Sequence, residues 1–217
     1  MTTPHYLSLR ENWQNAANAA GAKLEDVVFG TVLAHLDAKY PGQYAVKTHP
    51  KDLDLLWLDD KRRRDPSFFA VKPAEPKDGD IWYDETDRMF KTQEKGRSKR
   101  SRCGCEPDLG ITHLATGRKY FVECKQQNDA GNAHERAAKY ATPSSIAAIQ
   151  RCIGGVGYHP IGYLFSGSMV TNMKYILEIE ATYSFAAEHL LLWRPERPVD
   201  ALCEWIDRTV VPILTSP

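Results

Sequence analysis

Apolar residues recur every three to four positions near both ends of the chain, and this spacing predicts amphipathic helices there. The capping-box pattern Ser8-Leu9-Arg10-Glu11 predicts the start of a first helix, and Gly21 predicts its end. A second helix, ended by Pro41, is expected over the apolar stripe Leu24, Val27, Val28, Val32 and Leu36. A closing helix is expected from about Pro198 to Val211, with the inward positions Val199, Leu202, Cys203, Ile206 and Val210.

The middle of the chain changes to short apolar runs of the strand type. Buried strands are expected at Ile161 to Phe165 and at Leu190 to Trp193, and Val71 to Gly79 is expected to be irregular. Thr142-Pro143 predicts the cap and first residue of another helix. Its apolar stripe and its end are expected at Ile146, Ile149, Ile153 and Gly154-Gly155. Helices around strands predict an α/β fold with a mixed sheet, formed by all 217 residues as one domain.

Composition narrows the class of protein but does not identify a partner. Hydrophobic residues make up 42% and charged residues 26% of the chain, which is ordinary for a folded protein. No apolar run reaches about 18 residues, and the N-terminus lacks the pattern of a secretory signal. Five cysteines without framework spacing favour reduced thiols, so we expect a cytoplasmic protein with no membrane contact.

Positive charge is concentrated in two runs, although the net charge of the chain is zero. The first run is Lys61 to Arg64, and the second extends from Lys91 to Arg102 with Glu94 as its one acidic residue. Either run is compatible with a solvated loop. The second leads directly into the segment that carries the candidate chemistry.

Two strand-like runs around a turn at Gly117 predict a β-hairpin. Antiparallel pairing brings Asp108 near Glu123, and Glu123 and Lys125 leave the same face of their strand. Asp108, Glu123 and the backbone carbonyl of Cys124 can hold Mg²⁺, while Lys125 can orient an attacking water or help to deprotonate it. This is the PD…ExK arrangement of a superfamily of metal-dependent nucleases. The same short pattern also arises by chance, as solvated strand ends.

The segment Gly131-Asn132-Ala133-His134-Glu135-Arg136 decides between these interpretations. Asparagine can bond adenine N6 and N7 together, and an arginine can contact purine acceptors, although such a stretch can also be a polar loop with a helix cap. Together with further patches in the same order, this segment resembles the EcoRI/MunI family of type II restriction endonucleases, MunI in particular. The further patches are Asn12-Trp13-Gln14, Thr142-Pro143, Ile153-Gly154-Gly155 and Trp193-Arg194-Pro195.

The resemblance implies a fold, an activity and a set of residues. The fold is PD-(D/E)xK restriction-endonuclease-like, with a central mixed five-stranded sheet flanked by helices. The activity is Mg²⁺-dependent cleavage of double-stranded DNA by a homodimer, at a short palindrome with an AATT core, leaving 5′ overhangs and 5′-phosphates. A methyltransferase that protects the same site is the functional partner. The catalytic residues are Asp108, Glu123 and Lys125, and the residues at the bases are Gln127, Gly131, Asn132, Ala133 and Arg136.

The chain departs from the family pattern in two places. The connection between Lys125 and Gly131 is shorter, and Ala130 stands where MunI carries an arginine that reads the outer base pair. GAATTC, a degenerate outer pair and a bare AATT therefore all stay open. The stretch before Asp108 is longer, and we expect its Arg97, Lys99 and Arg100 to contact phosphates or a groove. Two alternatives remain, a structure-selective or repair nuclease of the same superfamily and a non-catalytic sequence-specific DNA-binding module.

Overall fold

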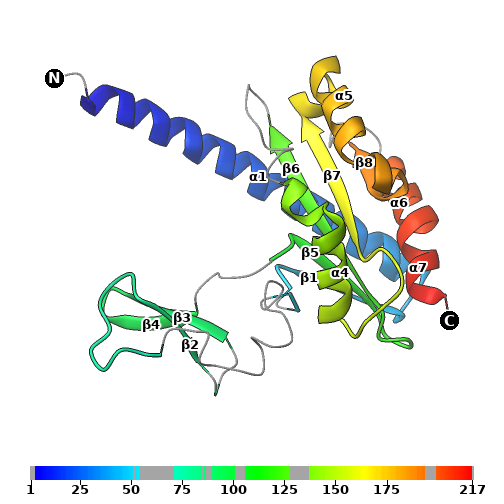
Figure 1. Ribbon diagram of the computed structural model, residues 1–217. Helices are drawn as coiled ribbons and strands as arrows, with labels where there is room; N and C mark the ends of the chain where they lie inside the picture. Colours follow the sequence, from blue (N-terminus) through cyan, green and yellow to red (C-terminus); the bar gives the residue numbers. More distant parts are fainter. Residues whose placement is uncertain are drawn as a thin grey trace. The chain divides into compact units, whose positions relative to one another are not determined.

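The computed structural model describes residues 3–50, 52–53, 71–84, 86, 89–100, 106–127, 137–193 and 199–216. The chain groups into two compact units (Figure 1). The first unit consists of Met1–Pro50, Pro107–Ile146 and Tyr158–Pro217, and the second of Lys51–Glu106 with Ala147–Gly157. That the whole chain acts as one domain stays a prediction.

A mixed five-stranded sheet forms the centre of the first unit, as predicted. Its order is β1-β5-β6-β7-β8, in which β1, β5 and β6 are antiparallel and β6, β7 and β8 are parallel. The two apolar runs near residues 161 and 190 form β7 and β8, so both strand predictions are confirmed. The strands are β1 (Tyr44–Thr48), β5 (Leu109–His113), β6 (Lys119–Gln127), β7 (Ile161–Gly167) and β8 (Leu190–Leu192).

Helix α1 (Thr3–Lys39) is one continuous helix, so the prediction of two helices is wrong. Ser8 and Gly21 both lie inside it. A glycine within a helix costs only about 1 kcal/mol relative to alanine, which is too little to end a helix whose later turns are held by the core. The end before Pro41 is confirmed. Figure 1 shows the later turns of α1 passing over the sheet, where α1 contacts β6 and β1 and buries Leu24, Val28, Val32 and Leu36.

The predicted closing helix forms, with an irregular middle. It consists of α6 (Asp200–Trp205), the π-helical turn η5 (Ile206–Val210) and α7 (Val211–Thr215). Pro212 follows the π turn, and a proline cannot donate the helical hydrogen bond to the preceding turn. Leu202, Ile206 and Val210 are buried as predicted, whereas Val199 is 46% exposed, so its prediction as an inward residue is wrong.

The aspartate of the π turn joins this closing helix to α1. Asp207 accepts hydrogen bonds from His35 Nε2 at 2.9 Å, Lys39 Nζ at 2.6 Å and Tyr40 Oη at 3.0 Å. Burial raises the pKa of Asp207, but these three partners outweigh that effect and the net pKa lies below its ordinary value. The N-terminal and C-terminal helices therefore pack together beside the sheet.

The 3₁₀ segment η4 (Ser184–His189) contacts β7, and helix α5 (Met173–Thr182) contacts η4. Tyr183, between them, contacts the rings of Tyr163 at 4.7 Å and Phe165 at 5.2 Å between centroids. The described part of this unit also contains two shorter 3₁₀ segments, η2 (Ala138–Tyr140) and η3 (Ser168–Val170). No helix of the described ranges is long and apolar enough to cross a membrane.

Helix α4 (Pro143–Cys152) begins and ends where the sequence predicts. Thr142 Oγ1 accepts a hydrogen bond from the Ser145 amide at 3.1 Å, which confirms the predicted cap. The helix ends before Gly154, whose φ of 106° favours glycine.

A second, three-stranded antiparallel sheet occupies the second unit, with the order β2-β3-β4. The described part of the second basic run, residues 91–100, lies in the β3–β4 hairpin. Lys95 and Gly96 form its turn, and both donate their amides to the Asp78 carboxylate, at 3.0 and 3.2 Å. Arg97 and Lys99 are two apart in β4 and therefore share a face of that strand. The strands are β2 (Ile81–Asp84), β3 (Met89–Glu94) and β4 (Arg97–Arg100).

Candidate active site

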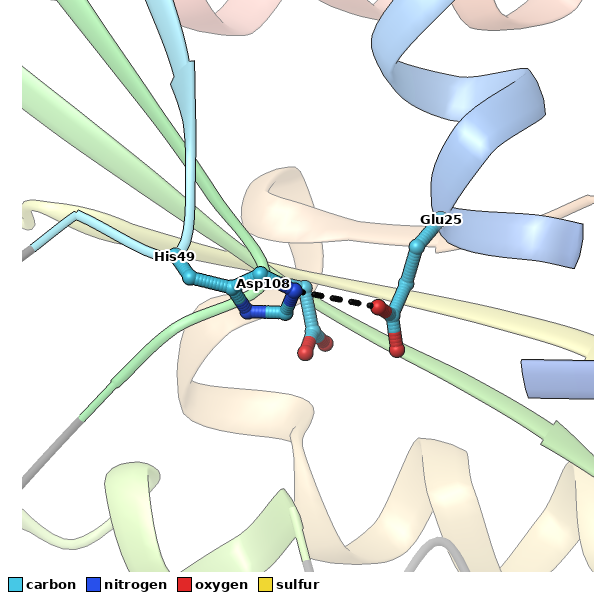
Figure 2. A group of neighbouring side chains, drawn as sticks. All are labelled: Glu25, His49 and Asp108. Carbon is cyan, nitrogen blue, oxygen red and sulfur yellow. Dashed lines mark ion pairs between the residues drawn. The ribbon is translucent and has the colours of Figure 1, made fainter. Parts of the chain in front are cut away.

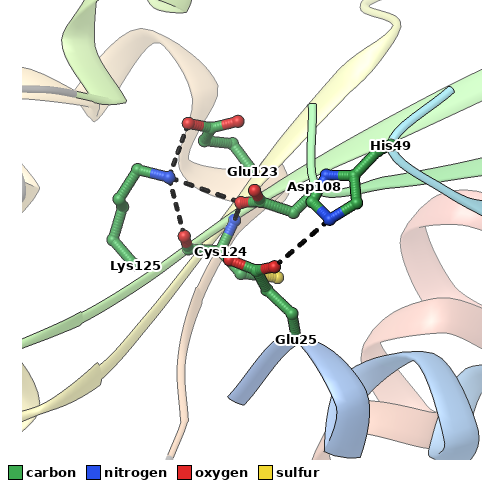
Figure 3. Close-up of polar contacts among 6 residues, drawn as sticks. All are labelled: Glu25, His49, Asp108, Glu123, Cys124 and Lys125. Atoms are coloured by element: carbon green, nitrogen blue, oxygen red, sulfur yellow. Dashed lines mark hydrogen bonds and ion pairs between the residues drawn. The ribbon is translucent and has the colours of Figure 1, made fainter. Parts of the chain in front are cut away.

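The predicted carboxylates and ammonium converge at the end of the β5–β6 hairpin. Gly117, with a φ of 68°, permits the turn, and the register pairs Leu109 with Val122, which brings Asp108 beside β6. Lys125 Nζ then lies 2.6 Å from Glu123 Oε1 and 3.3 Å from Asp108 Oδ2 (Figure 3). The convergence that the sequence predicts is therefore present.

Asp108 is held in place by the backbone on both sides. Its Oδ2 accepts a hydrogen bond from the Cys124 amide at 2.6 Å, and its carbonyl accepts one from the His49 amide at 3.1 Å. The Asp108 side chain is 12% exposed and that of Glu123 only 3%. The two carboxylates are thus fixed at the edge of the core, where their charges are poorly screened by solvent.

Lys125 compensates this negative charge. Burial lowers the pKa of its ammonium, but the Glu123 and Asp108 carboxylates outweigh burial and raise the pKa above its ordinary value. Lys125 Nζ also donates to the Cys124 carbonyl at 2.8 Å. The ammonium of Lys125 therefore lies close to three oxygen atoms. They belong to the three groups that the sequence predicts as metal ligands.

These oxygen atoms fit a hard divalent cation. Mg²⁺ and Mn²⁺ prefer carboxylate and carbonyl oxygens, and Asp108, Glu123 and the Cys124 carbonyl supply that set. The short distances of all three to Lys125 Nζ show that one cationic group can reach them together. The arrangement can place a cation and an ammonium beside the same reacting group.

Two further residues that the sequence analysis missed lie beside Asp108. Glu25 comes from α1 and His49 follows β1, and together with Asp108 each offers one ligand atom within 4.8 Å of the others (Figure 2). Burial, followed by the negative charge of Asp108, raises the pKa of Glu25. No local motif marks either residue. The one available signal is that Glu25 lies between Leu24 and Val28, near the apolar stripe of its helix.

The predicted base-contacting residues are only partly described. Gln127 lies at the C-terminal end of β6 with a buried side chain, and its carbonyl accepts a hydrogen bond from Ser168 Oγ at 2.7 Å. Gly131, Asn132, Ala133 and Arg136 lie outside the described residues, as does the run from Lys61 to Arg64. Their roles stay predictions.

The predicted phosphate-contacting residues Arg97, Lys99 and Arg100 lie in β4, in the second unit. Lys99 Nζ pairs with Glu94 Oε2 at 3.0 Å, and both side chains are exposed. The proposed contact with phosphates therefore concerns a strand rather than a loop, and it stays a prediction.

Comparisons with known proteins connect this geometry to one family. A family model described as "Type II restriction enzyme MunI" matches residues 2–215. The chain is 30% identical over 114 residues to the type II restriction enzyme MunI of Mycoplasma sp, an alignment that covers 46% of this chain and 56% of that protein. The chain thus matches about half the length of this relative.

A solved structure shows the same architecture. The crystal structure of MunI restriction endonuclease in complex with cognate DNA is similar to this chain with a TM-score of 0.57 and 22% sequence identity. The match covers 82% of this chain and 86% of that one. The mixed five-stranded sheet with its flanking helices is therefore the fold of that endonuclease, as the sequence predicts.

Proposed function

The chain belongs to the MunI family of type II restriction enzymes, and on this premise we propose that it cuts both strands of DNA at a short palindrome. The observation that carries the proposal is the convergence of Asp108, Glu123 and Lys125 at 2.6 and 3.3 Å. A protein that only binds DNA needs no such arrangement of charges. The convergence also uses the residues that the family resemblance assigns to catalysis.

The proposed cofactor is Mg²⁺, held by Asp108, Glu123 and the Cys124 carbonyl. When bound, such an ion neutralises the charge on the reacting phosphate and lowers the pKa of a bound water. Asp108 is pre-oriented for this role by the Cys124 amide, and Glu123 by its ion pair with Lys125. The ammonium of Lys125, with its raised pKa, is suited to orient the attacking water and to offset developing negative charge.

Recognition of an AATT core is proposed for the residues that match the family segment. Asn132 and Arg136 have the side chains that read purine edges, while Gly131 and Ala133 allow close approach of the backbone. Gln127 is the last residue of β6, the strand that carries Glu123 and Lys125. Ala130 has no hydrogen-bonding side chain, so the outer base pair is left open.

The assembly is proposed to be a homodimer on double-stranded DNA. Two identical subunits related by a two-fold axis match a palindrome, and each cuts one strand. The cut is proposed to precede the AATT core and to leave 5′ overhangs with 5′-phosphates. A methyltransferase of the same specificity would be the functional partner, and Arg97, Lys99 and Arg100 would contact phosphates.

Digestion of plasmid DNA with the purified full chain and Mg²⁺ tests this proposal. We expect discrete fragments, and sequencing of their ends identifies the site and the overhang. Asp108→Asn should lower the cleavage rate by at least about 100-fold, since it removes a charge that the cation and the attacking water need. Asp26→Asn, at an exposed position of α1, is the matched control and should cut normally.

The other outcomes contradict the proposal in different ways. A smear of fragments indicates a nuclease without site specificity, as the structure-selective alternative requires. Retardation of DNA without cutting indicates a binding module. Full activity of Asp108→Asn, with unchanged circular dichroism, would refute the catalytic assignment.

A further inference from the structure

We propose that Tyr163 and Ser168 are positioning residues for base recognition, because their hydroxyl groups hold the backbone on either side of residues 128–136. These residues are called the recognition segment below. The inference rests on the proposed function, which assigns the reading of the bases to this segment. Neither Tyr163 nor Ser168 belongs to the motifs that carry the family resemblance. Both act on specificity through the backbone of the segment and not by contact with DNA.

The backbone before the recognition segment is held at the end of β6. Gln127 is the last residue of that strand, and its side chain is buried. Ser168 Oγ donates a hydrogen bond to the Gln127 carbonyl at 2.7 Å. Gly167, which pairs with Gln127, has a φ of 77° that favours glycine, and η3 begins with Ser168 directly after it. The Ser168 hydroxyl therefore fixes the carbonyl from which the chain leaves the sheet.

The backbone after the recognition segment is held by a buried hydroxyl. Tyr163 Oη donates to the Tyr140 carbonyl at 2.9 Å, and neither side chain is more than 1% exposed. Ala137, the first residue after the segment, is fully buried as well. In such surroundings bulk water does not replace a hydrogen bond that is lost. The Tyr163 hydroxyl therefore fixes the point at which the chain has returned to the core.

Both positioning residues belong to the strand beside the proposed catalytic one or follow it directly. Figure 1 shows β6 and β7 side by side, and their parallel register places Tyr163 opposite Glu123. Residues that pair in this way project from the same face of a sheet. Ser168 follows Gly167, the last residue of β7. The strand β7 therefore relates the backbone on both sides of the recognition segment to the position of the proposed catalytic carboxylate.

The ring of Tyr163 is held by packing that does not depend on its hydroxyl. The ring lies 4.7 Å from that of Tyr183 and 6.4 Å from that of His159, between centroids. Tyr163→Phe keeps these ring contacts and removes one oxygen atom. This variant therefore tests the hydrogen bond to Tyr140 and not the packing of the core.

Placement of the recognition segment matters because base reading depends on short distances. Hydrogen bonds to base edges weaken when the two partners move apart by a few tenths of an ångström. A misplacement of about 1 Å can lower a reaction rate by about 100-fold. A DNA site with one altered base pair already lacks some of these contacts, so it has less to lose. Loss of either hydroxyl should therefore lower cleavage of the cognate site more than cleavage of altered sites.

Cleavage of short duplexes by the full chain with Mg²⁺ tests the inference. The duplexes carry either the site that the wild type cuts or a version with one central base pair changed. The measured quantity is the specificity ratio, kcat/KM for the cognate duplex divided by kcat/KM for the altered one. We expect Tyr163→Phe and Ser168→Ala each to lower this ratio by about 10-fold, which corresponds to the loss of roughly one good base contact.

Two variants that remove similar hydroxyl groups elsewhere are the matched controls. Tyr158 Oη donates to the Lys119 carbonyl at 2.8 Å, at the opposite end of β6, so Tyr158→Phe matches Tyr163→Phe. Ser184 Oγ donates to the Ala181 carbonyl at 3.2 Å, so Ser184→Ala matches Ser168→Ala. Both controls should keep the specificity ratio of the wild type.

A double-mutant cycle with Asn132→Ala distinguishes positioning from a general structural effect. If Tyr163 acts by placing Asn132, Tyr163→Phe should lower the specificity ratio by about 10-fold in the wild type and by less than about 2-fold in Asn132→Ala. A general structural effect lowers the ratio by the same factor in both backgrounds, and that result would overturn the inference for Tyr163.

The remaining outcomes separate this inference from the proposed function. A wild type that cuts one site, with the same specificity ratio in Tyr163→Phe and Ser168→Ala, overturns the inference and leaves the proposed function intact. A wild type that cuts or binds DNA without sequence preference overturns both. If circular dichroism shows that Tyr163→Phe does not fold, Ser168→Ala decides alone, since position 168 is only half-buried.

Discussion

At the scale of single residues, Lys125 sets the charge balance of the active site. Its ammonium lies 2.6 Å from Glu123, whose side chain is 3% exposed. We expect Lys125→Met to lower the free energy of unfolding in EDTA by about 3 kcal/mol, because a buried carboxylate loses its close cation. Mn²⁺ should restore part of this loss, and cleavage should fall by about 10²- to 10⁴-fold. Urea unfolding with and without Mn²⁺ measures the first effect, and plasmid digestion the second.

Lys174→Met is the matched control for this variant. Lys174 forms an exposed pair with Glu178 at 3.8 Å, and such pairs contribute roughly 0 to 1 kcal/mol. Its replacement should change neither the unfolding curve nor cleavage to a comparable degree. Equal losses of unfolding free energy and of cleavage for the two variants would mean that burial does not make the Lys125 ion pair more important than an exposed one.

Two neighbouring histidines predict a second residue-scale effect, on stability at low pH. The rings of His159 and His189 lie 4.0 Å apart between centroids. Burial lowers the pKa of both to about 4 from 6.5, and the charge of His189 adds to the effect on His159. The unfolded chain therefore binds more protons between pH 6.5 and 4. The contribution of the two histidines to the free energy of unfolding should be at its maximum above about pH 6.5. It should decrease as the pH is lowered from 6.5 to about 4.

Urea midpoints measured in steps from pH 7 to pH 4 test this dependence. His159→Asn removes one titrating ring, so its midpoint should fall less steeply than that of the wild type across the window. Other groups contribute to both curves equally, and the difference between them isolates the histidine. Parallel curves would show that the pair is not protonated on unfolding.

The site residues also show which parts of the active site can be predicted from the sequence alone. Asp108, Glu123 and Lys125 could be placed together because a hairpin and a two-residue period are local properties of the chain. Glu25 and His49 could not, because they reach Asp108 only through the packing of α1 and β1 on the sheet. A lone acid in a helix and a lone histidine after a strand carry no local signal of a shared site.

At the scale of elements, the parallel pair β6–β7 positions Glu123, and its packing is tight at Gly162. The register pairs Gly162 with Val122, and a Cβ at Gly162 would meet Trp205 Cζ2 and Tyr120 Oη, both at 2.7 Å. We expect Gly162→Ala to lower the free energy of unfolding by about 1 to 3 kcal/mol, since two buried rings must move. Thermal or urea unfolding measures the loss.

Gly30→Ala is the control for this substitution. A Cβ at Gly30, within α1, would meet no atom inside 4 Å. Alanine is the better helix former by about 1 kcal/mol, so this variant should be more stable than the wild type. A loss of stability at Gly30 similar to that at Gly162 would contradict the packing argument.

Helices and strands could be predicted from the sequence where the spacing of apolar residues determines them. They could not be predicted where such spacing is absent. The stripe from Leu24 to Leu36 and the run from Ile161 gave a helix and a strand correctly, because burial enforces their period. Gly21 did not end α1, because a weak local preference yields to the tertiary contacts of the later turns. The β2–β4 sheet escaped prediction because β4 contains no apolar residue, and the apolar stretches of β2 and β3, residues 81–83 and 89–90, are too short to show a period.

At the scale of the whole molecule, attraction to DNA must come from local charge, since the net charge is zero. The hairpin of β3 and β4 carries a local concentration of positive charge on regular secondary structure. Asp78 fixes its turn through the Lys95 and Gly96 amides, and Arg97 and Lys99 share one face of β4. Glu94, 3.0 Å from Lys99, opposes this charge.

The salt dependence of DNA binding tests whether this hairpin meets phosphates. Each phosphate neutralised contributes about −0.9 to the slope of log affinity against log salt, so Arg97→Ala/Lys99→Ala should flatten the slope by roughly two units. Glu94→Gln should strengthen binding, because it removes the charge that competes with phosphate for Lys99. Lys174→Ala, which removes a similarly exposed and paired lysine of α5, is the control and should leave the slope unchanged. Equal slopes for the hairpin double variant and the wild type would exclude the hairpin from the DNA contact.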